Sequence, residues 1–257
     1  MTTAPPPSPG SLSSRWLRTL HAAGRPRVRL VCFPHAGGAA GFFRDWPRWL
    51  APDIELLAVR YPGREDRILD EPASGMAELA DSVAAALGGL PALPTAFFGH
   101  SMGASVAYEV ALRMRTSGVP DLLMVSGRAA PHRLRAFPLA DDEALVADVR
   151  RRGGPLAAAL DHPELLDLVL PAIRADYRLL DAYAAEAELC EVGVPVAAFY
   201  GEADPDVPAE SVLAWAGTSP GAFTARGFAG GGHFYLVEHA ADLVGDIGAR
   251  LAALTAV

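Results

Sequence analysis

The stretch that decides the fold is Thr95-Ala-Phe-Phe-Gly-His-Ser-Met-Gly-Ala-Ser-Val-Ala-Tyr-Glu-Val-Ala-Leu112. Successive apolar residues predict a buried strand over residues 95–98, and the apolar spacing from Met102 onward predicts a helix. Between them lies Gly99-His-Ser-Met-Gly103, a G-x-S-x-G motif in the strand–turn–helix context that presents a nucleophilic serine. The turn is so tight that side chains at its two glycines would collide with neighbouring backbone. Ser101 is pushed out above the sheet and is predicted to be a nucleophile.

Short apolar runs alternate with helical patterns on both sides of this stretch. Strands are expected at residues 29–33, 55–59, 95–98, 122–126, 196–200 and 223–228. Helices are expected at residues 42–50, 76–87, 102–116, 209–215 and 240–254. The aromatic residues of the first helix are assigned to packing; they are Phe42, Phe43, Trp46 and Trp49. The alternation predicts an α/β fold with a mostly parallel central sheet flanked by helices.

One segment, residues 131–190, interrupts the alternation. It contains no convincing strand but has helix-like stretches at 141–152, 163–170 and 173–187. Asp141 suits the cap of the first helix, and Pro163 suits the first turn of the second. An all-helical insertion between two core strands indicates a cap over one edge of the sheet.

Length and cysteine content favour one simple domain. A chain of 257 residues suffices for a single α/β domain. The Pro- and Ser-rich residues 1–14 are expected to be a flexible tail, which leaves residues 15–257 for the domain. Cys32 and Cys190 are too few for a disulfide framework and lack the spacing of a metal site. We therefore expect a monomer that holds no metal and no cofactor.

Charge and hydropathy narrow the location and the ligands. The formal net charge of −8 argues against duplex nucleic acid, because binding phosphates needs a basic face. Residues 83–108 carry no Asp, Glu, Lys or Arg, but glycines and prolines between 88 and 94 interrupt them, so no membrane span is expected. The N-terminus lacks the basic and apolar regions of a signal peptide. The sequence thus predicts a cytoplasmic protein that binds neither nucleic acid nor membrane.

A nucleophilic serine needs an acid that orients its base. With this motif the acid precedes the histidine in the chain, and each follows a later strand. Asp204 comes just after the strand expected at 196–200 and is our choice. Asp206 and Glu202 stay open as alternatives, and Asp-Pro-Asp is also ordinary turn chemistry.

The base is predicted to be His233. It follows three glycines, Gly230-Gly-Gly, behind the last expected strand, and such a loop is free to place an imidazole against Ser101. His100 lies beside the nucleophile and is expected to point elsewhere, while His35 lies in a different loop. The remaining histidines are expected at the surface; they are His21, His132, His162 and His239.

Two backbone N–H groups are expected to hold the oxyanion of the reaction. The residue after the nucleophile, Met102, supplies one of them. The loop Phe33-Pro-His-Ala-Gly-Gly38, behind an early strand, supplies the other, and by position we assign it to Ala36. An ordinary Gly-Gly turn is the alternative interpretation of this loop.

Five motifs in this order resemble the stand-alone type II thioesterases of polyketide and nonribosomal peptide synthesis. They are Phe33-Pro-His-Ala-Gly-Gly, Arg60-Tyr-Pro-Gly-Arg-Glu, Gly99-His-Ser-Met-Gly-Ala, Ser126-Gly-Arg and Gly231-Gly-His-Phe, and the similarity spans about residues 29–257. The resemblance implies an α/β-hydrolase fold and hydrolysis of acyl groups from the phosphopantetheine arm of acyl or peptidyl carrier proteins, as in antibiotic biosynthesis. It also implies that residues 131–190 form a mobile helical lid. Glu202 departs from the family, which often has Asp there.

Arginines cluster in two places, at Arg44, Arg48, Arg60, Arg64 and Arg67, and at Arg150-Arg-Arg152. One interpretation is a solvated face with local ion pairs. The other is docking of an acidic carrier protein or contact with the pantetheine phosphate, which suits the bidentate guanidinium.

Two other functions are compatible with the motifs. A carboxylesterase acting on free oxygen esters would use the same three residues. A non-catalytic protein of this fold, serving as receptor or scaffold, usually lacks one of them, and this chain has all three.

Overall fold

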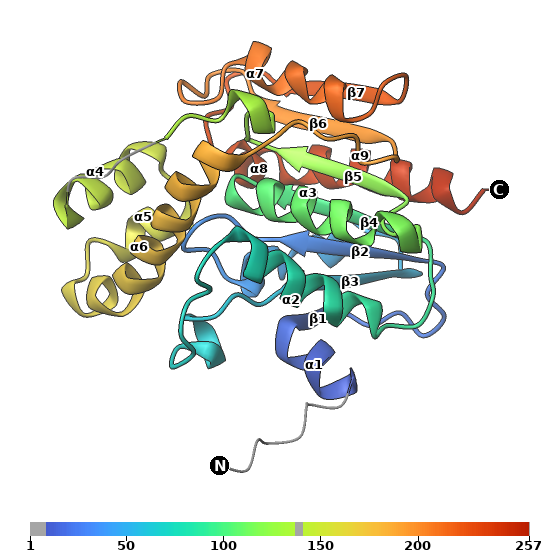
Figure 1. The fold of residues 1–257 in the computed structure, drawn as a ribbon, viewed down its shortest axis with the longest axis horizontal. Coiled ribbons are helices and arrows are strands. Elements are labelled where there is room, and N and C mark those ends of the chain that lie inside the picture. Colours follow the sequence, from blue (N-terminus) through green and yellow to red (C-terminus); the bar gives the residue numbers. More distant parts are fainter. Residues whose placement is uncertain (1–8, 137–140, 257) are drawn as a thin grey trace.

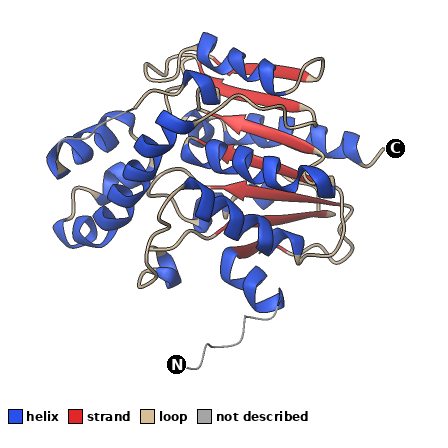
Figure 2. Ribbon diagram, in the orientation of Figure 1, coloured by secondary structure: helices blue, strands red, loops and turns tan. Residues whose placement is uncertain are grey.

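The structure, a computed structural model, describes residues 9–136 and 141–256. In this part of the chain a seven-stranded sheet has the order β1-β3-β2-β4-β5-β6-β7 (Figures 1 and 2). The strands are β1 (Leu17–His21), β2 (Val28–Phe33), β3 (Ile54–Val59), β4 (Thr95–His100), β5 (Leu122–Ser126), β6 (Val196–Gly201) and β7 (Phe223–Phe228). All neighbours pair in parallel except β1, which is antiparallel to β3. The predicted α/β fold with a mostly parallel sheet is confirmed.

Successive residues of the strands point alternately into two apolar layers, one on each face of the sheet. On one face Phe97 and its equivalents pack against α2 (Met76–Gly88) and α3 (Met102–Met114). On the other face Phe98 and its equivalents pack against α9 (Ala240–Leu254) (Figure 1). Both faces are buried, which explains why the central strands are apolar at successive positions. The short elements along the edges are α7 (Ala209–Leu213), α8 (Tyr235–Glu238), η3 (Glu65–Arg67), η4 (Arg115–Ser117), η5 (Pro131–Arg133) and η6 (Ala214–Thr218).

The segment predicted as a tail is shorter than residues 1–14. Helix α1 (Pro9–Trp16) covers its second half, while residues 1–8 lie outside the described residues. The Ser13 hydroxyl is buried and donates to the carbonyl oxygen of Ala86, 2.8 Å away on α2. Trp16 and the partly buried Leu12 pack against the same apolar layer. The prediction was wrong for residues 9–14 because these contacts lie far away in the sequence.

Two other local predictions need correction. Strand β1 was missed, because its exposed Arg18 and Thr19 hide an apolar run. Residues 42–50 form no single helix: η1 (Ala40–Phe43) and η2 (Trp46–Arg48) are two short 3₁₀ turns separated by Arg44 and Asp45. The packing assignment of the aromatic residues holds for Phe43 and Trp46, but Trp49 is 40% exposed.

Three helices lie between β5 and β6, at the side of the sheet where the strands end (Figure 1). They are α4 (Asp142–Arg152), α5 (Pro155–Ala159) and α6 (Pro163–Glu186). Asp141 caps α4, with its Oδ1 accepting from the Ala144 amide at 2.9 Å. The two helices predicted at 163–170 and 173–187 are one, because α6 continues through Pro171. Residues 137–140 of the predicted insertion lie outside the described residues.

Across the described residues, no helix combines the length and the apolar character needed to cross a membrane.

Candidate active site

The turn between β4 and α3 presents Ser101. Ser101 has a φ of +54°, in the left-handed region that side chains rarely adopt. A Cβ atom at Gly99 would lie 2.1 Å from the carbonyl oxygen of Gly103, and one at Gly103 would lie 2.0 Å from that of Phe33. Both positions therefore require glycine. The Ser101 amide donates to the Ser126 carbonyl oxygen at 2.8 Å, which fixes the strained turn to β5.

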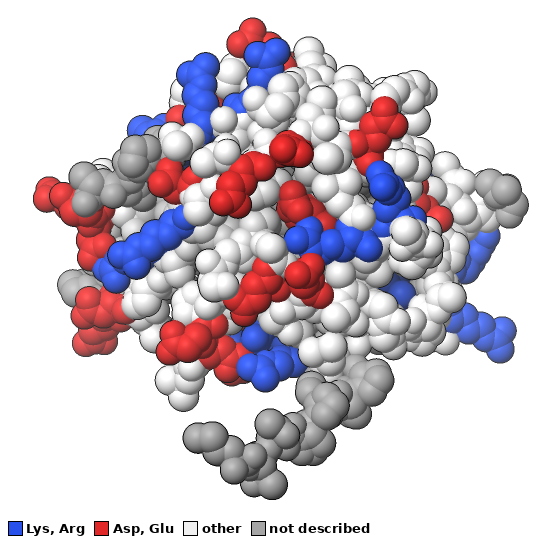
Figure 3. All heavy atoms as spheres, viewed as in Figure 1, with Lys and Arg blue, Asp and Glu red and all other residues white. Residues whose placement is uncertain are grey.

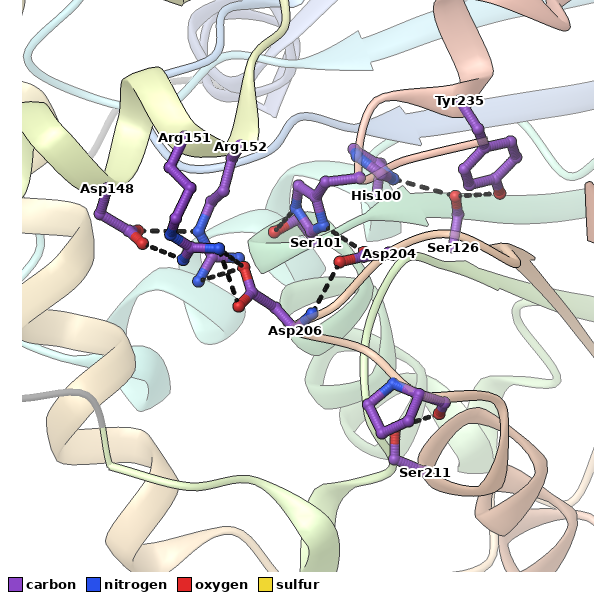
Figure 4. Close-up of polar contacts among 12 residues, drawn as sticks. His100, Ser101, Ser126, Asp148, Arg151, Arg152, Asp204, Asp206, Ser211 and Tyr235 are labelled. Atoms are coloured by element: carbon purple, nitrogen blue, oxygen red, sulfur yellow. Dashed lines mark hydrogen bonds and ion pairs between the residues drawn. The ribbon is translucent and has the colours of Figure 1, made fainter. Parts of the chain in front are cut away.

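The structure brings the three predicted side chains together. His233 Nε2 lies 3.1 Å from Ser101 Oγ, and His233 Nδ1 lies 2.7 Å from Asp204 Oδ2. Ser101, Asp204 and their hydrogen bonds can be followed in Figure 4. The three residues come from the loops behind β4, β6 and β7, whose ends meet at one edge of the sheet. This order of hydroxyl, imidazole and carboxylate is that of a nucleophile, base and orienting acid.

The surroundings of Asp204 keep it ionised. Burial alone would raise its pKa, but the hydrogen bond and charge of His233, together with the Asp206 amide, hold the pKa of Asp204 below its usual value. That amide donates to Asp204 Oδ1 at 3.0 Å. The alternative acids face elsewhere: Asp206 pairs with Arg151 and Arg152, and Glu202 is exposed.

His35 and His100 are buried near His233 and are held neutral. Burial, followed by the nearby His233, lowers the pKa of His35 to about 3 and that of His100 well below its ordinary value. His100 Nδ1 lies 2.9 Å from the Ser126 hydroxyl, which in turn lies 2.6 Å from the Tyr235 hydroxyl (Figure 4). His100 is thus bound away from Ser101, as predicted.

The two residues whose amides are assigned to the oxyanion lie near Ser101: Met102 follows it in the chain, and Ala36 lines the same cavity. Among the described residues, neither the Met102 nor the Ala36 N–H donates a hydrogen bond, so both are available to a ligand. The loop that carries Ala36 is held in place by the next residue, because the Gly37 amide donates to Asp176 Oδ2 of α6 at 2.7 Å. Sequence reasoning missed Asp176, which carries no motif.

Arg64 helps to hold the loop that carries Ala36, through Asp176, and does not lie on a docking surface. It is 8% exposed and binds Asp176 in a fork, with Nη1–Oδ2 and Nη2–Oδ1 distances of 2.7 and 2.8 Å. Arg67 is buried as well and binds Asp70. Other members of the clusters also have acidic partners; the pairs are Arg48–Asp45, Arg60–Asp66 and Arg150–Asp161. On the face shown in Figure 3, basic and acidic side chains are interspersed. The ion-pair interpretation of the clusters is therefore favoured.

Two cavities meet at Ser101 and His233. One lies under α4 and α6 and is lined by Ala36, Leu156, Tyr177, Leu180 and Phe234. The other, of about 550 Å³, opens between the loops behind β5 and β6. Helix α4 is fastened to the acid loop here, because Arg151 and Arg152 bridge Asp148 and Asp206 (Figure 4). Within the described part of the chain, no cluster of His, Cys, Asp and Glu could hold a metal ion.

The chain is similar to known proteins over most of its length. A family model described as thioesterase domain matches residues 28–251. Thioesterase PikA5 of Streptomyces venezuelae is 41% identical over 249 residues, covering 93% of this chain and 86% of PikA5. The probable cadicidin biosynthesis thioesterase of Streptomyces griseus is 39% identical over 230 residues; these span 88% of this chain but 63% of that protein, less than two thirds of its length.

Among solved structures, the type II thioesterase BorB from the borrelidin biosynthetic cluster aligns with a TM-score of 0.82. Its sequence is 38% identical, and the alignment covers 92% of this chain and 97% of BorB. The shared fold and the match of the family model to most of the domain agree with each other. The chain therefore belongs to the thioesterase family of α/β-hydrolases, enzymes that hydrolyse thioesters.

Proposed function

We propose that this enzyme hydrolyses acyl groups from the phosphopantetheine arm of acyl or peptidyl carrier proteins, for editing or release in polyketide or nonribosomal peptide synthesis. The observation that carries the proposal is the hydrogen-bonded chain Ser101–His233–Asp204 at the junction of two cavities. Relatives named for biosynthetic thioesterases, at about 40% identity over most of the chain, support the substrate class.

The first chemical step forms an acyl-enzyme. His233 Nε2 takes the proton of Ser101 as Oγ attacks the thioester carbonyl carbon, and the Met102 and Ala36 N–H groups hold the oxyanion. When the carbon–sulfur bond breaks, the pantetheine sulfur leaves as a thiolate, which is a good leaving group and needs little help from an acid. The thiolate then takes the proton from His233 Nε2, so the imidazole is neutral again before the second step. Asp204 keeps the second proton on Nδ1 and stabilises the imidazolium.

The second step releases the acid. Water attacks the acyl-Ser101 ester while His233 takes its proton, and the oxyanion forms again on the same two amides. Collapse of the intermediate returns a proton from His233 to Ser101 Oγ. The carboxylic acid leaves and the free enzyme is restored.

We assign the role of a lid to the helical insertion. One cavity lies between the catalytic residues and the side chains of α4 and α6, so movement of those helices would change the access of an acyl chain. The fork of Arg64 on Asp176 and the bridge from Arg151 and Arg152 to Asp206 are among the contacts that hold the insertion against the core. The carrier protein remains outside, with only its arm reaching Ser101.

A panel of acyl carrier proteins tests the proposal. We expect intact-protein mass spectrometry to show an acyl adduct on the enzyme, and the Ser101→Ala variant to form no adduct and to lose roughly 10⁶-fold in rate. Ser117→Ala is the control, because its hydroxyl donates to the Met114 carbonyl oxygen at 2.7 Å beyond the far end of α3 and lines neither cavity. Near-full hydrolysis by Ser101→Ala would contradict the proposal. Equal activity on simple oxygen esters would indicate a carboxylesterase instead.

A further inference from the structure

Arg128 holds a guanidinium beside the helix of the nucleophile. It follows β5, and its Nε donates to the hydroxyl of Ser105 on α3 at 3.0 Å. Ser105 lies one helical turn beyond Ser101, so the two serines are roughly 5–6 Å apart. The backbone of Arg128 is anchored too, because Trp215 Nε1 donates to its carbonyl oxygen at 2.9 Å. The guanidinium is therefore fixed close to the position of a bound acyl group.

This guanidinium has no counter-ion. Within residues 9–136 and 141–256, no Asp or Glu oxygen comes within 4.0 Å of it. Burial, and then the charge of Arg152, lower the pKa of Arg128 to about 10, which still leaves the group charged at neutral pH. The contrast with Arg64 is sharp, since that buried arginine has Asp176 as its partner.

The free edge of Arg128 opens onto the catalytic cavities. Arg128 lines both of them, together with Ser101 and His233. Its two terminal nitrogens bind nothing among the described residues, yet they are not sealed inside the protein. Arg135 and Arg152 add positive charge to the same walls. Of the acidic residues that line them, Asp206 is engaged by Arg151 and Arg152, while Asp181 and Glu210 offset part of the positive charge.

A partly buried charge without a partner lowers stability, whereas a rigid guanidinium with a free edge fits a carboxylate through two hydrogen bonds. We propose that Arg128 forms an anion subsite in the acyl cavity, and that the enzyme accepts acyl groups bearing a carboxylate. With bonds of about 1.5 Å, the carboxylate would lie roughly two to four carbons from the thioester carbonyl. The inference rests on the proposed function, because Ser101 defines where the acyl carbonyl sits.

The anion belongs to the acyl group and not to the arm that carries it. The phosphate of phosphopantetheine lies at the opposite end of the arm from the sulfur, whereas Arg128 lies within a helical turn of Ser101. Acyl groups of this class are the half-thioesters of short dicarboxylic acids, such as succinate.

Butyryl and succinyl thioesters of one carrier protein are matched in carbon number and differ in the carboxylate. We expect the wild-type enzyme to hydrolyse the succinyl thioester at least as efficiently as the butyryl thioester. In Arg128→Gln, kcat/KM for the succinyl substrate should fall about 10- to 100-fold, as for loss of a hydrogen-bonded charge, while that for butyryl changes less than about threefold.

Two further variants sharpen the experiment. Arg178→Gln makes the same change in charge at an exposed position of α6 and should leave the succinyl-to-butyryl ratio unchanged. Arg128→Lys keeps the charge but not the planar fork and should retain part of the ratio, and it carries the test should Arg128→Gln fail to fold.

The possible outcomes separate the two hypotheses. Hydrolysis of butyryl but not succinyl thioester by the wild type, or an equal fall of both in Arg128→Gln, overturns the anion subsite and leaves the proposed function intact. The same loss in Arg178→Gln would overturn it too, because the preference for succinyl would then come from the overall charge of the protein and not from a contact with Arg128. Hydrolysis of neither thioester by the wild type would overturn the proposed function itself.

Discussion

Two aspartates of one loop, Asp204 and Asp206, differ in what they face. Asp204 is buried against His233 Nδ1, while the carboxylate of Asp206 binds Arg151 and Arg152. Both follow the same strand, and the sequence pattern left both open as the orienting acid. Because their contacts differ, substituting each aspartate separately distinguishes the two alternatives.

We predict that Asp204→Asn lowers kcat about 10⁴-fold on an acyl carrier protein. The amide cannot hold the tautomer of His233 that accepts the serine proton, nor stabilise the imidazolium. Asp206→Asn is the matched control and should cost less than about tenfold, because it weakens only partly exposed ion pairs. Equal losses in the two variants, measured by single-turnover kinetics, would be incompatible with Asp204 as the orienting acid.

For single residues, the sequence indicates the reacting side chains but not the residues that hold them in position. Ser101 and His233 lie in glycine-rich turns behind predicted strands, and local sequence alone is enough to find them. Asp176 lies in the middle of a helix with no motif, and its contacts to Gly37 and Arg64 join segments more than 100 residues apart. Arg64 had been grouped with surface arginines, because burial of a charged residue depends on a partner that the local sequence does not contain.

Helix α6 is joined to the oxyanion loop through one carboxylate. Asp176 accepts from the Gly37 amide and from both terminal nitrogens of Arg64. Both charged side chains are less than a tenth exposed, so each depends on the other for its solvation. This junction links the position of the insertion to the geometry of the oxyanion site.

We predict that Asp176→Asn lowers the free energy of unfolding by about 3–5 kcal/mol, because it leaves the Arg64 charge buried without a counter-ion. The oxyanion loop also loses its anchor, so kcat should fall more than KM changes. Urea unfolding and steady-state kinetics measure the two effects.

The double variant Asp176→Leu/Arg64→Met provides the control. Removing both charges leaves no buried charge unpaired, so the double variant should be more stable than Asp176→Asn even though the Gly37 amide loses its acceptor. Should Asp176→Asn unfold at the same urea concentration as the wild type, the carboxylate would not be the counter-ion that the geometry indicates.

The strands buried on both faces followed from the sequence, and so did the edge strand β7, whereas the edge strand β1 did not. Strands β2 to β6 are apolar at successive positions, and their predicted bounds agree with the structure to within two residues. The edge strand β1 is half-exposed, so its pattern is diluted by Arg18 and Thr19. Helix α1 needed the contact of Ser13 with α2, which no local pattern can show.

The molecule as a whole buries two neutral histidines, His35 and His100, close to His233. His35 packs edge-on against the rings of Phe42 and Phe234, and His100 is bound to Ser126. Both have a folded-state pKa well below the ordinary histidine value. Below about pH 6.5 the unfolded chain therefore binds protons that the folded protein does not.

We predict that the protein loses stability as the pH falls from 7 to 5. A base whose pKa is lowered on folding stabilises the fold above its unfolded pKa, and this contribution is lost progressively down to the folded value, about 3 for His35. For His35 the loss amounts to about 2 kcal/mol between pH 7 and pH 5, and His100 acts in the same direction. Urea unfolding at several pH values in this range measures it.

The His35→Phe variant removes the contribution of His35 to the pH dependence and leaves that of His100. Among the described residues His35 Nδ1 binds no partner, so a phenyl ring leaves no polar group unsatisfied and keeps the packing against Phe42 and Phe234. Its free energy of unfolding should depend less steeply on pH, by up to about 1.4 kcal/mol per pH unit, the slope of one proton. Most carboxylates titrate below this range, so the difference between the two slopes reports on the histidine. Parallel slopes for the two proteins would mean that His35 takes up its proton in the folded state, against the burial that the structure gives it.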